Sequence, residues 1–393
     1  MRLAIDATPV VPGRKGLGVV IEGFLDEVGT RSQAGSWIVY VDRTFEDEAR
    51  RRWPLMDVRS VRARPSVLWE QAILPRRARR DGADLLFTGR DRTLCEPHVA
   101  TVVYLFEVPD HRSRALLEST ASHAAKIVAS YSLRRFRTIA GRVSDFIVSS
   151  KATGQELRDK YRVPEDRIHV VHPGLSKRFR PPENAEAKQV ARDRYCEGRP
   201  YVLHFATGDP RENTRVALRS FAAAASQAAN PVALLLAGVR AADEADLAFR
   251  AQDLGIGQRT FFLGRMDDDT LGGVYHGAEV YLDPTLYEGF GLQLVEAMAC
   301  GVPVISSNVT SVPEVVGEAG LLFDPRDEHG FADALERVLS DGKLRARLAE
   351  KGSNRAAMFR WPDAASKILG LLERFSRESD ERKQVGSRGG STR

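Results

Sequence analysis

Short apolar segments separated by helix-forming segments recur along the chain, and this alternation restricts the possible folds more than any other feature. In the first half, strands are expected at residues 3–5, 37–41, 84–87, 102–105, 145–148 and 168–171. They are apolar runs rather than polar–apolar alternations, which is typical of parallel strands covered by helices on both faces. The pattern therefore predicts an α/β protein built on doubly wound parallel sheets.

The alternation is interrupted once and then repeated. The pattern breaks near His172-Pro173-Gly174, and the polar residues 176–200 are expected to form an interdomain linker. A second series follows, with strands expected at 201–205, 232–237, 260–263, 279–282, 303–305 and 320–323, and helices at 213–228, 241–253, 292–299 and 328–340. Two Rossmann-like domains facing an interdomain cleft are predicted, which suits the length of 393 residues.

The domain limits expected from this pattern are residues 1–180 and 181–360. A helix at 361–375 should cross back to the first domain. The tail at 376–393 lacks core-forming residues, so we expect it to be disordered.

Composition and charge exclude several classes of protein. No apolar run is long enough to span a bilayer, and the N-terminus shows no secretory signal pattern, so a cytoplasmic location is expected. Cys95, Cys196 and Cys300 are too widely spaced to indicate a disulfide framework or a zinc site. The net charge of +5 comes with no nucleic-acid-binding motif, so no nucleic-acid partner is expected.

Two arginine clusters remain open to two interpretations. They lie on helices expected in the first domain, and consist of Arg76, Arg77, Arg79 and Arg80, and of Arg134, Arg135 and Arg137. Each could be a solvated helix face, or could dock on an anionic surface such as the inner face of the membrane or a phosphorylated acceptor.

The most informative segment is residues 284–325, where a glycine-containing loop leads into a helix. The loop reads Tyr287-Glu288-Gly289-Phe290-Gly291, and the helix begins at Leu292. Free N–H groups and the positive end of the dipole make a helix N-terminus a site for phosphate or sugar oxygens. The glycines let the backbone approach a ligand closely. This segment is therefore the predicted ligand site.

Two carboxylates frame that segment. Glu288 lies in the loop, and Glu296 lies on the helix among apolar residues, where it should be partly buried. A buried carboxylate without a partner is costly, and a diol could donate two hydrogen bonds to it. The alternative is that both glutamates only cap or salt-bridge the local structure.

The E-x7-E spacing, set in YEGFGL…EAMACGVPV and followed by VPEVVGEAGLLFDP, resembles the signature of retaining glycosyltransferase family 4, the group 1 glycosyl transferases of GT-B fold. The resemblance implies that Glu288 contacts the donor sugar and that Glu296 binds the ribose hydroxyls. It also implies that the backbone amides of Gly289, Phe290, Gly291 and Leu292 contact the sugar and the diphosphate. Gln293 stands where the family usually has proline.

Other segments extend the resemblance over most of the chain. Residues 68–89 and 143–181 are similar to the family's N-domain patterns, and Phe359-Arg360-Trp361 resembles the start of its returning helix. Gly16 and Gly18 match the first β–α turn, which the resemblance places opposite the donor diphosphate. Thr207 and Gly208 are expected to line the donor site, and Arg265 lies where the nucleobase is expected.

The sequence departs from the family at the cations that neutralise the diphosphate. Ala206 occupies the position of the usual arginine, and Glu212 occupies that of the usual lysine. Losing both cations should cost catalysis several kcal/mol unless others replace them. Arg211, Arg215 or Lys15 could substitute, and Arg211 is the residue we expect to do so.

A further departure follows the strand 102–105. Phe106-Glu107 replaces a His-Asp pair that is common in the family. Phe106 could stack on a sugar face, and Glu107 could bind an acceptor hydroxyl or act as a weak general base. Asp110 and His111 could supply the missing polar function, although His111 also fits an exposed helix position.

The function implied by the resemblance is a retaining hexosyltransferase. It would move a sugar from a nucleoside-diphosphate sugar to a hydroxyl of a glycan, a lipid-linked acceptor or a natural product, without a metal or further cofactor. The segment Asp267-Asp268-Asp269 is better explained as the N-cap of a helix than as a metal site. The alternatives are a sugar-nucleotide epimerase, and a catalytically silent GT-B protein that binds a nucleotide sugar or a partner enzyme.

Overall fold

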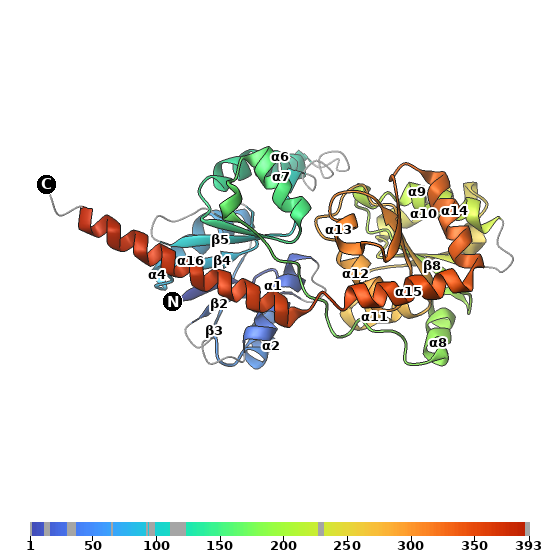
Figure 1. Cartoon of the computed structure of the whole chain (residues 1–393), viewed down its shortest axis with the longest axis horizontal. Coiled ribbons are helices and arrows are strands. Elements are labelled where there is room, and N and C mark those ends of the chain that lie inside the picture. The colour runs from blue at the N-terminus through green and yellow to red at the C-terminus, as the bar shows by residue number, and fades with distance from the viewer. Residues whose placement is uncertain are drawn as a thin grey trace. The chain divides into compact units, whose positions relative to one another are not determined.

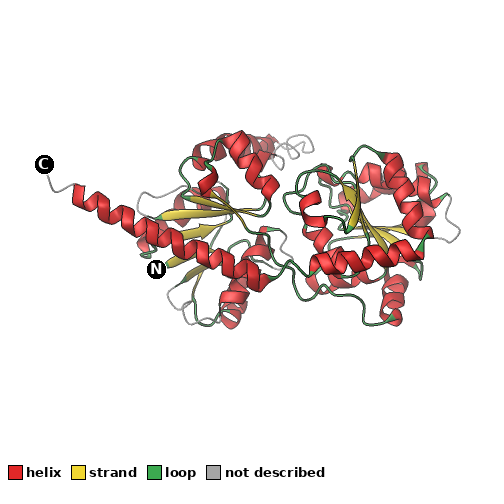
Figure 2. Cartoon of the chain, in the orientation of Figure 1, coloured by secondary structure: helices red, strands yellow, loops and turns green. Residues whose placement is uncertain are grey.

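The computed structural model describes residues 2–11, 16–29, 37–63, 66–91, 93, 99–110, 123–226 and 232–389. The chain divides into two compact units (Figure 1). The first contains residues 1–174 and 360–393, and the second contains residues 175–359. The first unit thus ends before the limit expected at residue 180, and the chain returns to it at Arg360. In both units the strands gather into one sheet with helices packed around it (Figure 2).

The first unit holds a seven-stranded parallel sheet in the order β3-β2-β1-β4-β5-β6-β7. Its strands are β1 (Leu3–Asp6), β2 (Ile38–Asp42), β3 (Asp57–Val61), β4 (Leu85–Thr88), β5 (Ala100–Leu105), β6 (Asp145–Val148) and β7 (Ile168–Val170). The helices are α1 (Leu17–Val28), η2 (Arg43–Phe45), α2 (Glu46–Arg52), α3 (Ser66–Leu68), the π-helix η3 (Trp69–Ile73), α4 (Leu74–Arg80), α6 (His123–Ala140), α7 (Lys151–Tyr161), η4 (Glu165–Arg167) and α16 (Trp361–Gly389).

The C-terminal helix α16 completes the core of this unit by packing on α1. A Cβ atom on Gly23 of α1 would lie 2.2 Å from the Trp361 ring, so the glycine permits close helix packing. The apolar face of α16 joins the cluster formed by β1, β4 and α1, and its members Ile368 and Leu372 are almost fully buried. The return of the chain to the first unit therefore rests on apolar burial.

The second unit holds a six-stranded parallel sheet in the order β10-β9-β8-β11-β12-β13. Its strands are β8 (Tyr201–Phe205), β9 (Ala233–Ala237), β10 (Thr260–Leu263), β11 (Ala278–Asp283), β12 (Val304–Ser307) and β13 (Gly320–Phe323). The helices are α8 (Ala185–Cys196), η5 (Pro210–Glu212), α9 (Thr214–Ala225), α10 (Ala241–Asp253), η6 (Gly257–Arg259), α11 (Asp268–His276), α12 (Leu292–Ala299), α13 (Val312–Val316), α14 (Glu328–Ser340) and α15 (Gly342–Ala356).

The strand order reverses once in each sheet. In the first unit the reversal lies between β1 and β4, and in the second it lies between β8 and β11. In parallel α/β sheets, ligands bind at this switch point, outside the carboxyl ends of the strands. The fold therefore directs the search for a site to the loops that follow these four strands.

The segment 176–200 was expected to be a linker, and this prediction is wrong for its second half. Asn184 caps helix α8 by accepting a 2.8 Å hydrogen bond from the amide of Ala187. Arg192 and Lys188 of α8 both pair with Glu279 of β11. The helix carries few apolar residues, and ion pairs help attach it to the sheet, so its pattern did not indicate a buried face.

The C-terminal segment also differs from the expectation. Helix α16 was expected at 361–375 with a disordered tail at 376–393, but it continues to Gly389. Phe375 and Ser376 are still buried, and Arg374 pairs with Glu378 one turn later at 3.6 Å. Such i,i+4 pairs support a helix beyond the point where apolar packing ends. None of the described helices is both long and apolar enough to cross a membrane.

Candidate functional site

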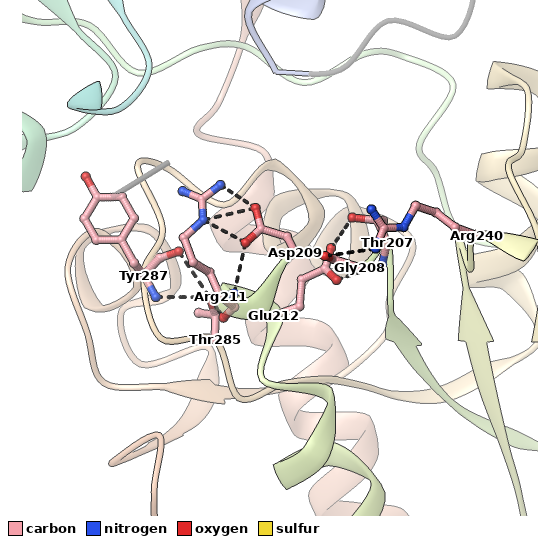
Figure 3. A network of polar contacts seen from close by, with 8 residues as sticks. All are labelled: Thr207, Gly208, Asp209, Arg211, Glu212, Arg240, Thr285 and Tyr287. Atoms are coloured by element: carbon pink, nitrogen blue, oxygen red, sulfur yellow. Dashed lines mark hydrogen bonds and ion pairs between the residues drawn. The ribbon is translucent and has the colours of Figure 1, made fainter. Parts of the chain in front are cut away.

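Two loops at the switch point of the second sheet form the candidate site. The β8–α9 loop covers residues 206–213 and the β11–α12 loop covers 284–291. The carbonyl oxygen of Arg211 joins them, since it accepts a hydrogen bond from the hydroxyl of Thr285 at 3.1 Å (Figure 3). It accepts another from the amide of Leu286 at 2.8 Å. The two loops are thus held as one structural element.

Glu212 folds back onto the β8–α9 loop. Its carboxylate accepts a 2.7 Å hydrogen bond from the amide of Thr207 and a second from the Thr207 hydroxyl. Between them, Gly208 adopts a φ of +82°, and a Cβ atom there would lie 2.2 Å from the guanidinium of Arg240. The left-handed φ therefore favours glycine at this turn. The Arg240 guanidinium lies next to it, 3.5 Å from the Gly208 carbonyl. The carboxylate occupies the position at which the sequence predicted the loss of a cation.

Burial changes the ionisation of this loop. Desolvation raises the pKa of Glu212 to about 7, against the opposing effect of the Thr207 hydrogen bonds. Desolvation, followed by repulsion from Glu212, likewise raises the pKa of Asp283 to about 7. Ionisation of both carboxyl groups at once is unfavourable, because the two negative charges repel each other. The loop therefore carries less negative charge than its composition suggests.

Arg211 is the cation positioned between the two loops. Its guanidinium binds Asp209 through Nη2–Oδ2 at 2.7 Å and Nε–Oδ1 at 3.0 Å, and lies 6.0 Å from the ring centroid of Tyr287 (Figure 3). Burial alone would raise the pKa of Asp209, but hydrogen bonds from Arg211 lower it overall. The Arg211 side chain is only 21% exposed, so it is held in place rather than being a free turn residue.

The β11–α12 loop presents the N-terminus of α12. Gly291 precedes the helix with a φ of +87°, and no side chain caps it. The backbone of Glu288 is held by Thr310, whose hydroxyl contacts the Glu288 amide at 3.0 Å and carbonyl at 2.8 Å, and by the Ser311 hydroxyl at 2.9 Å. This arrangement leaves the helix end able to receive anionic oxygens beside a fixed Glu288 backbone.

Glu296 already has a protein partner. The hydroxyl of Tyr275 donates a 2.8 Å hydrogen bond to its Oε2, and the residue is 8% exposed. Tyr275 in turn packs edge-on against Phe179 and Tyr281. The expectation that burial of Glu296 itself implies a diol ligand was therefore incomplete, because Tyr275 satisfies part of the carboxylate.

The structure brings most of the predicted donor residues to one sheet edge. Thr207, Gly208 and Arg211 share the first loop, and residues 288–292 with Glu296 follow in the second loop and its helix. Arg265 is exposed and follows β10, the edge strand on the far side of β9. Arg215 is exposed on α9. Arg211 lies in the first loop and contacts the second, which favours it over Arg215 as the substitute cation.

The predicted residues of the first unit are more dispersed. Gly16 precedes α1 with a φ of +49°, and Gly18 is buried in the first turn of that helix. Phe106 and Glu107 follow β5 and are half-buried. Asp110 accepts a hydrogen bond from the Tyr161 hydroxyl of α7. His111, Lys15 and Cys95 lie outside the described residues.

Three features of the site bear on other predictions. The sequence analysis did not predict a role for Thr310 or Tyr275. Thr310 does lie within the segment 284–325, so its position in that segment could have indicated a role, whereas its residue type could not. Asp267 accepts a 2.7 Å hydrogen bond from the amide of Thr270, which confirms the predicted N-cap. Within the described part of the chain, no cluster of three His, Cys, Asp or Glu side chains could hold a metal ion.

Known proteins resemble this chain in both sequence and fold. The model of the family "Glycosyl transferases group 1" matches residues 188–355. The O-antigen chain mannosyltransferase B of Escherichia coli is 32% identical over 228 residues, 58% of this chain and 58% of its own length. A D-inositol 3-phosphate glycosyltransferase of Corynebacterium glutamicum is 31% identical over 57% of this chain and 56% of its own length. The chain thus aligns with little more than half of these relatives.

Solved structures match almost the whole chain. Sucrose-phosphate synthase from Thermosynechococcus elongatus superposes with a TM-score of 0.72 at 22% identity, covering 95% of this chain and 98% of that chain. Anabaena HepE in complex with UDP-glucose gives 0.71 at 18% identity, covering 94% and 99%. WaaG, a glycosyltransferase of lipopolysaccharide biosynthesis, gives 0.69 at 15% identity, covering 94% and 99%. The two parallel sheets therefore form the predicted GT-B fold.

Proposed function

We propose that this chain, which carries a group 1 glycosyl transferase domain over residues 188–355, transfers a hexose from a nucleoside-diphosphate sugar to an acceptor hydroxyl with retention at the anomeric carbon. The observation that carries the proposal is the junction of the two loops at Arg211. It places a guanidinium beside the segment that bears Glu288 and the uncapped N-terminus of α12. A cation and the N-terminus of a helix at one sheet edge suit a diphosphate leaving group.

In this proposal each element of the second unit has one task. Glu288 binds hydroxyls of the donor sugar, and Glu296, oriented by Tyr275, binds the ribose hydroxyls. The amides from Gly289 to Leu292 receive the sugar and phosphate oxygens. Arg211 supplies the positive charge that Ala206 and Glu212 do not, because its planar guanidinium can bind two phosphate oxygens at once. No metal ion is needed when these groups stabilise the leaving diphosphate.

The first unit would bind the acceptor. Phe106 and Glu107 follow β5 at the carboxyl edge of the first sheet, where ligands of such sheets bind. Glu107 is the candidate to receive an acceptor hydroxyl. Asp110 is engaged by Tyr161, which assigns it a role in holding this loop to α7.

The relatives suggest a donor sugar and an acceptor class to test first. O-antigen chain mannosyltransferase B makes mannose the first sugar to test, and a glycan chain the first acceptor. HepE was solved with UDP and with UDP-glucose, which places UDP among the diphosphates to compare. The amides proposed to bind the donor do not by themselves select one nucleobase.

One observation favours a second candidate, a catalytically silent protein that binds a nucleotide sugar. Asp209 holds Arg211 with two short contacts, and Glu212 adds a second carboxylate to the same loop. If Asp209 kept Arg211 away from phosphate, the donor would bind through amides alone and its diphosphate would leave slowly. The two candidates differ in turnover and not in fold.

Thermal stabilisation of the purified chain by UDP, GDP, ADP and dTDP, with their mannose and glucose conjugates, tests the proposal. A ligand at about 100 times its Kd adds roughly 2.7 kcal/mol to the free energy of unfolding, which shifts Tm visibly. Stabilisation by one diphosphate that is lost in Glu296→Ala, together with release of that diphosphate from its sugar, supports the transferase. Stabilisation without release by any conjugate supports the silent protein, and no stabilisation contradicts both.

We also propose that the arginine-rich helix α4 lets the chain associate peripherally with an anionic membrane from the cytoplasmic side. Arg76, Arg79 and Arg80 are exposed on α4, whereas Arg77 is half-buried and pairs with Asp81. Sedimentation with vesicles containing phosphatidylglycerol, compared with phosphatidylcholine alone, tests this. Equal recovery of the protein in both supernatants would contradict it.

A further inference from the structure

A second polar cluster lies in the first unit, apart from the donor loops. Arg90 is its centre: Nε donates to Asp6 at 2.9 Å, Nη1 to Glu70 at 2.9 Å and Nη2 to the Thr8 hydroxyl at 2.7 Å. Asp6 also accepts hydrogen bonds from the amide and hydroxyl of Thr8 at 3.2 and 2.6 Å. We call these four residues the Arg90 cluster.

The Arg90 cluster occupies the switch point of the first sheet. Asp6 is the last residue of β1, and Arg90 follows closely on the end of β4, the strand that pairs with β1 where the order reverses. Glu70 belongs to the π-helix η3. π-helical turns are rare and frequently mark functional sites. Two independent features, topology and local backbone, therefore point to a ligand here.

The burial within the cluster is uneven. The Asp6 side chain is fully buried and that of Glu70 is 1% exposed, whereas the Arg90 side chain is 17% exposed. The bonds to Asp6, Glu70 and Thr8 leave further N–H hydrogens on both terminal nitrogens of Arg90. Asp6 and Glu70 therefore hold the guanidinium in one orientation, and Arg90 is the member of the cluster with the largest exposed fraction.

The charge of the cluster limits the ligand. Among its four residues, two buried carboxyl groups lie against one guanidinium, so the formal negative charges outnumber the positive ones. Burying ionic groups is expensive, and hydrophobic residues would often be as stable, so a cluster of this kind is weak evidence for a purely stabilising role. An anionic ligand would be repelled by the carboxylates behind Arg90, whereas a neutral hydroxyl can accept a hydrogen bond from the guanidinium edge without that penalty.

We propose that the Arg90 cluster is a binding site for hydroxyl groups of an uncharged carbohydrate, the acceptor of the transfer. Arg90 makes the contact, and Asp6 and Glu70 are positioning residues. The acceptor role rests on the proposed function. A site of this kind does not favour a phosphorylated polyol as acceptor. The name of one relative, D-inositol 3-phosphate glycosyltransferase, specifies such a polyol. We therefore expect this chain to prefer a different class of acceptor from that relative.

Direct binding by the full chain tests this inference without requiring turnover. Saturation-transfer NMR with methyl glycosides of mannose, glucose and galactose, and with D-inositol 3-phosphate, measures each Kd. We expect at least one methyl glycoside to bind more tightly than the inositol phosphate. Arg90→Lys, which keeps the charge and loses the fork, should weaken that glycoside about tenfold, the equivalent of about 1.4 kcal/mol.

Arg59→Lys is the matched control. Arg59 also pairs with two carboxylates in the same unit, Asp57 and Asp81, both at 2.7 Å. We expect it to leave glycoside binding unchanged. A comparable loss in both variants, or no loss in Arg90→Lys, would overturn the inference. Tighter binding of D-inositol 3-phosphate than of every methyl glycoside would overturn it as well.

A second variant covers the case in which Arg90→Lys does not fold. Glu70→Gln keeps the shape of the side chain and removes one buried negative charge, so it should narrow the preference for a neutral ligand over D-inositol 3-phosphate. Nucleotide binding in the second unit is the readout that separates the two proposals. If donor stabilisation fails while glycoside binding responds to Arg90→Lys, the donor proposal fails and this site stands; the reverse pattern rejects this site alone.

Discussion

The hydroxyl of Tyr275 lies 2.8 Å from Oε2 of Glu296, and both residues are buried in the second unit. Desolvation raises the pKa of Tyr275 well above its ordinary value, so the hydroxyl keeps its proton and donates at neutral pH. A hydrogen-bond donor on one side of the Glu296 carboxylate fixes the orientation of that carboxylate. The hydrogen bond is therefore expected to matter for a ligand that Glu296 binds, as well as for stability.

Tyr275→Phe should separate these two effects. Loss of a hydrogen bond to a charged group should lower the free energy of unfolding by about 1.5–3 kcal/mol. We expect the Kd of the preferred nucleoside diphosphate to rise about tenfold, and that of its 2′-deoxy analogue to rise much less, as titration calorimetry can show. Tyr201→Phe, which removes a buried hydroxyl bonded to the Val274 carbonyl at 2.6 Å, is the control. It should cost stability without changing ribose discrimination; equal effects on both nucleotides in Tyr275→Phe would contradict the positioning role.

Substitutions of Arg211 and Asp209 should have opposite effects on how well the enzyme uses its donor. Arg211→Gln removes the proposed diphosphate cation, and we expect kcat to fall by about a hundredfold or more, as for loss of one oxyanion donor. Asp209→Asn keeps the shape and releases the guanidinium from its short contact, so donor Kd should decrease. Steady-state kinetics with the donor found by thermal stabilisation would measure both. Unchanged kcat in Arg211→Gln would reject Arg211 as the substitute cation.

Stability should fall as pH rises through the range set by Glu212. Its pKa rises from 4.5 in the unfolded chain to about 7 in the fold, so between those values the unfolded chain loses a proton that the folded chain keeps. The free energy of unfolding therefore decreases from about pH 4.5 to about pH 7. Glu212→Gln resembles the protonated form, so it should be more stable than wild type at pH 8 and equal to it near pH 4.

Urea unfolding across pH 4–8 measures this difference. Glu328→Gln, which alters a half-buried carboxylate paired with Arg219 at 3.0 Å, serves as the control. The affinity for the nucleotide-sugar donor should also be higher in Glu212→Gln than in wild type at pH 8 and equal near pH 4, because an ionised Glu212 repels the diphosphate. The phosphate's own titration affects both proteins equally and cancels in the comparison. A difference between Glu212→Gln and wild type that does not vary with pH would contradict the raised pKa.

Much of the fold was predictable because its signals are local. The strands at 201–205 and 320–323 were predicted at their observed bounds because both are continuous apolar runs, the first fully buried and the second half-buried at the sheet edge. Strand β3 (Asp57–Val61) was missed because it is an edge strand with exposed polar residues. Helix α8 was missed because ionic contacts with Glu279 hold it, and those involve a residue far along the chain.

The site was predictable to a smaller extent. Glu288, Glu296 and the loop glycines were found from a contiguous motif. The Tyr275 bond to Glu296 and the Arg90 cluster were not, because each joins residues brought together only by the tertiary fold. Asp6 and Arg90 are 84 positions apart, and no spacing rule connects them. Contacts of this kind are visible only in the structure.

The glycine that begins α12 offers a last test of the proposed donor site. Gly291 has a φ of +87°, and a Cβ atom there would lie 2.6 Å from the Cδ1 of Leu294. In Gly291→Ala the strain of the left-handed conformation should cost about 1–2 kcal/mol. Displacement of Leu294 should also shift the first turn of α12, whose amides are proposed to receive the diphosphate.

Gly255→Ala provides the comparison that isolates this second effect. Gly255 has a φ of +71° with no atom within 4 Å of the added Cβ, so it carries similar backbone strain without a steric contact. We expect both variants to lose similar stability in urea, while only Gly291→Ala weakens nucleoside-diphosphate binding. If the two variants bind the diphosphate equally well, the N-terminus of α12 does not hold the donor, and the phosphate contacts must come from the β8–α9 loop.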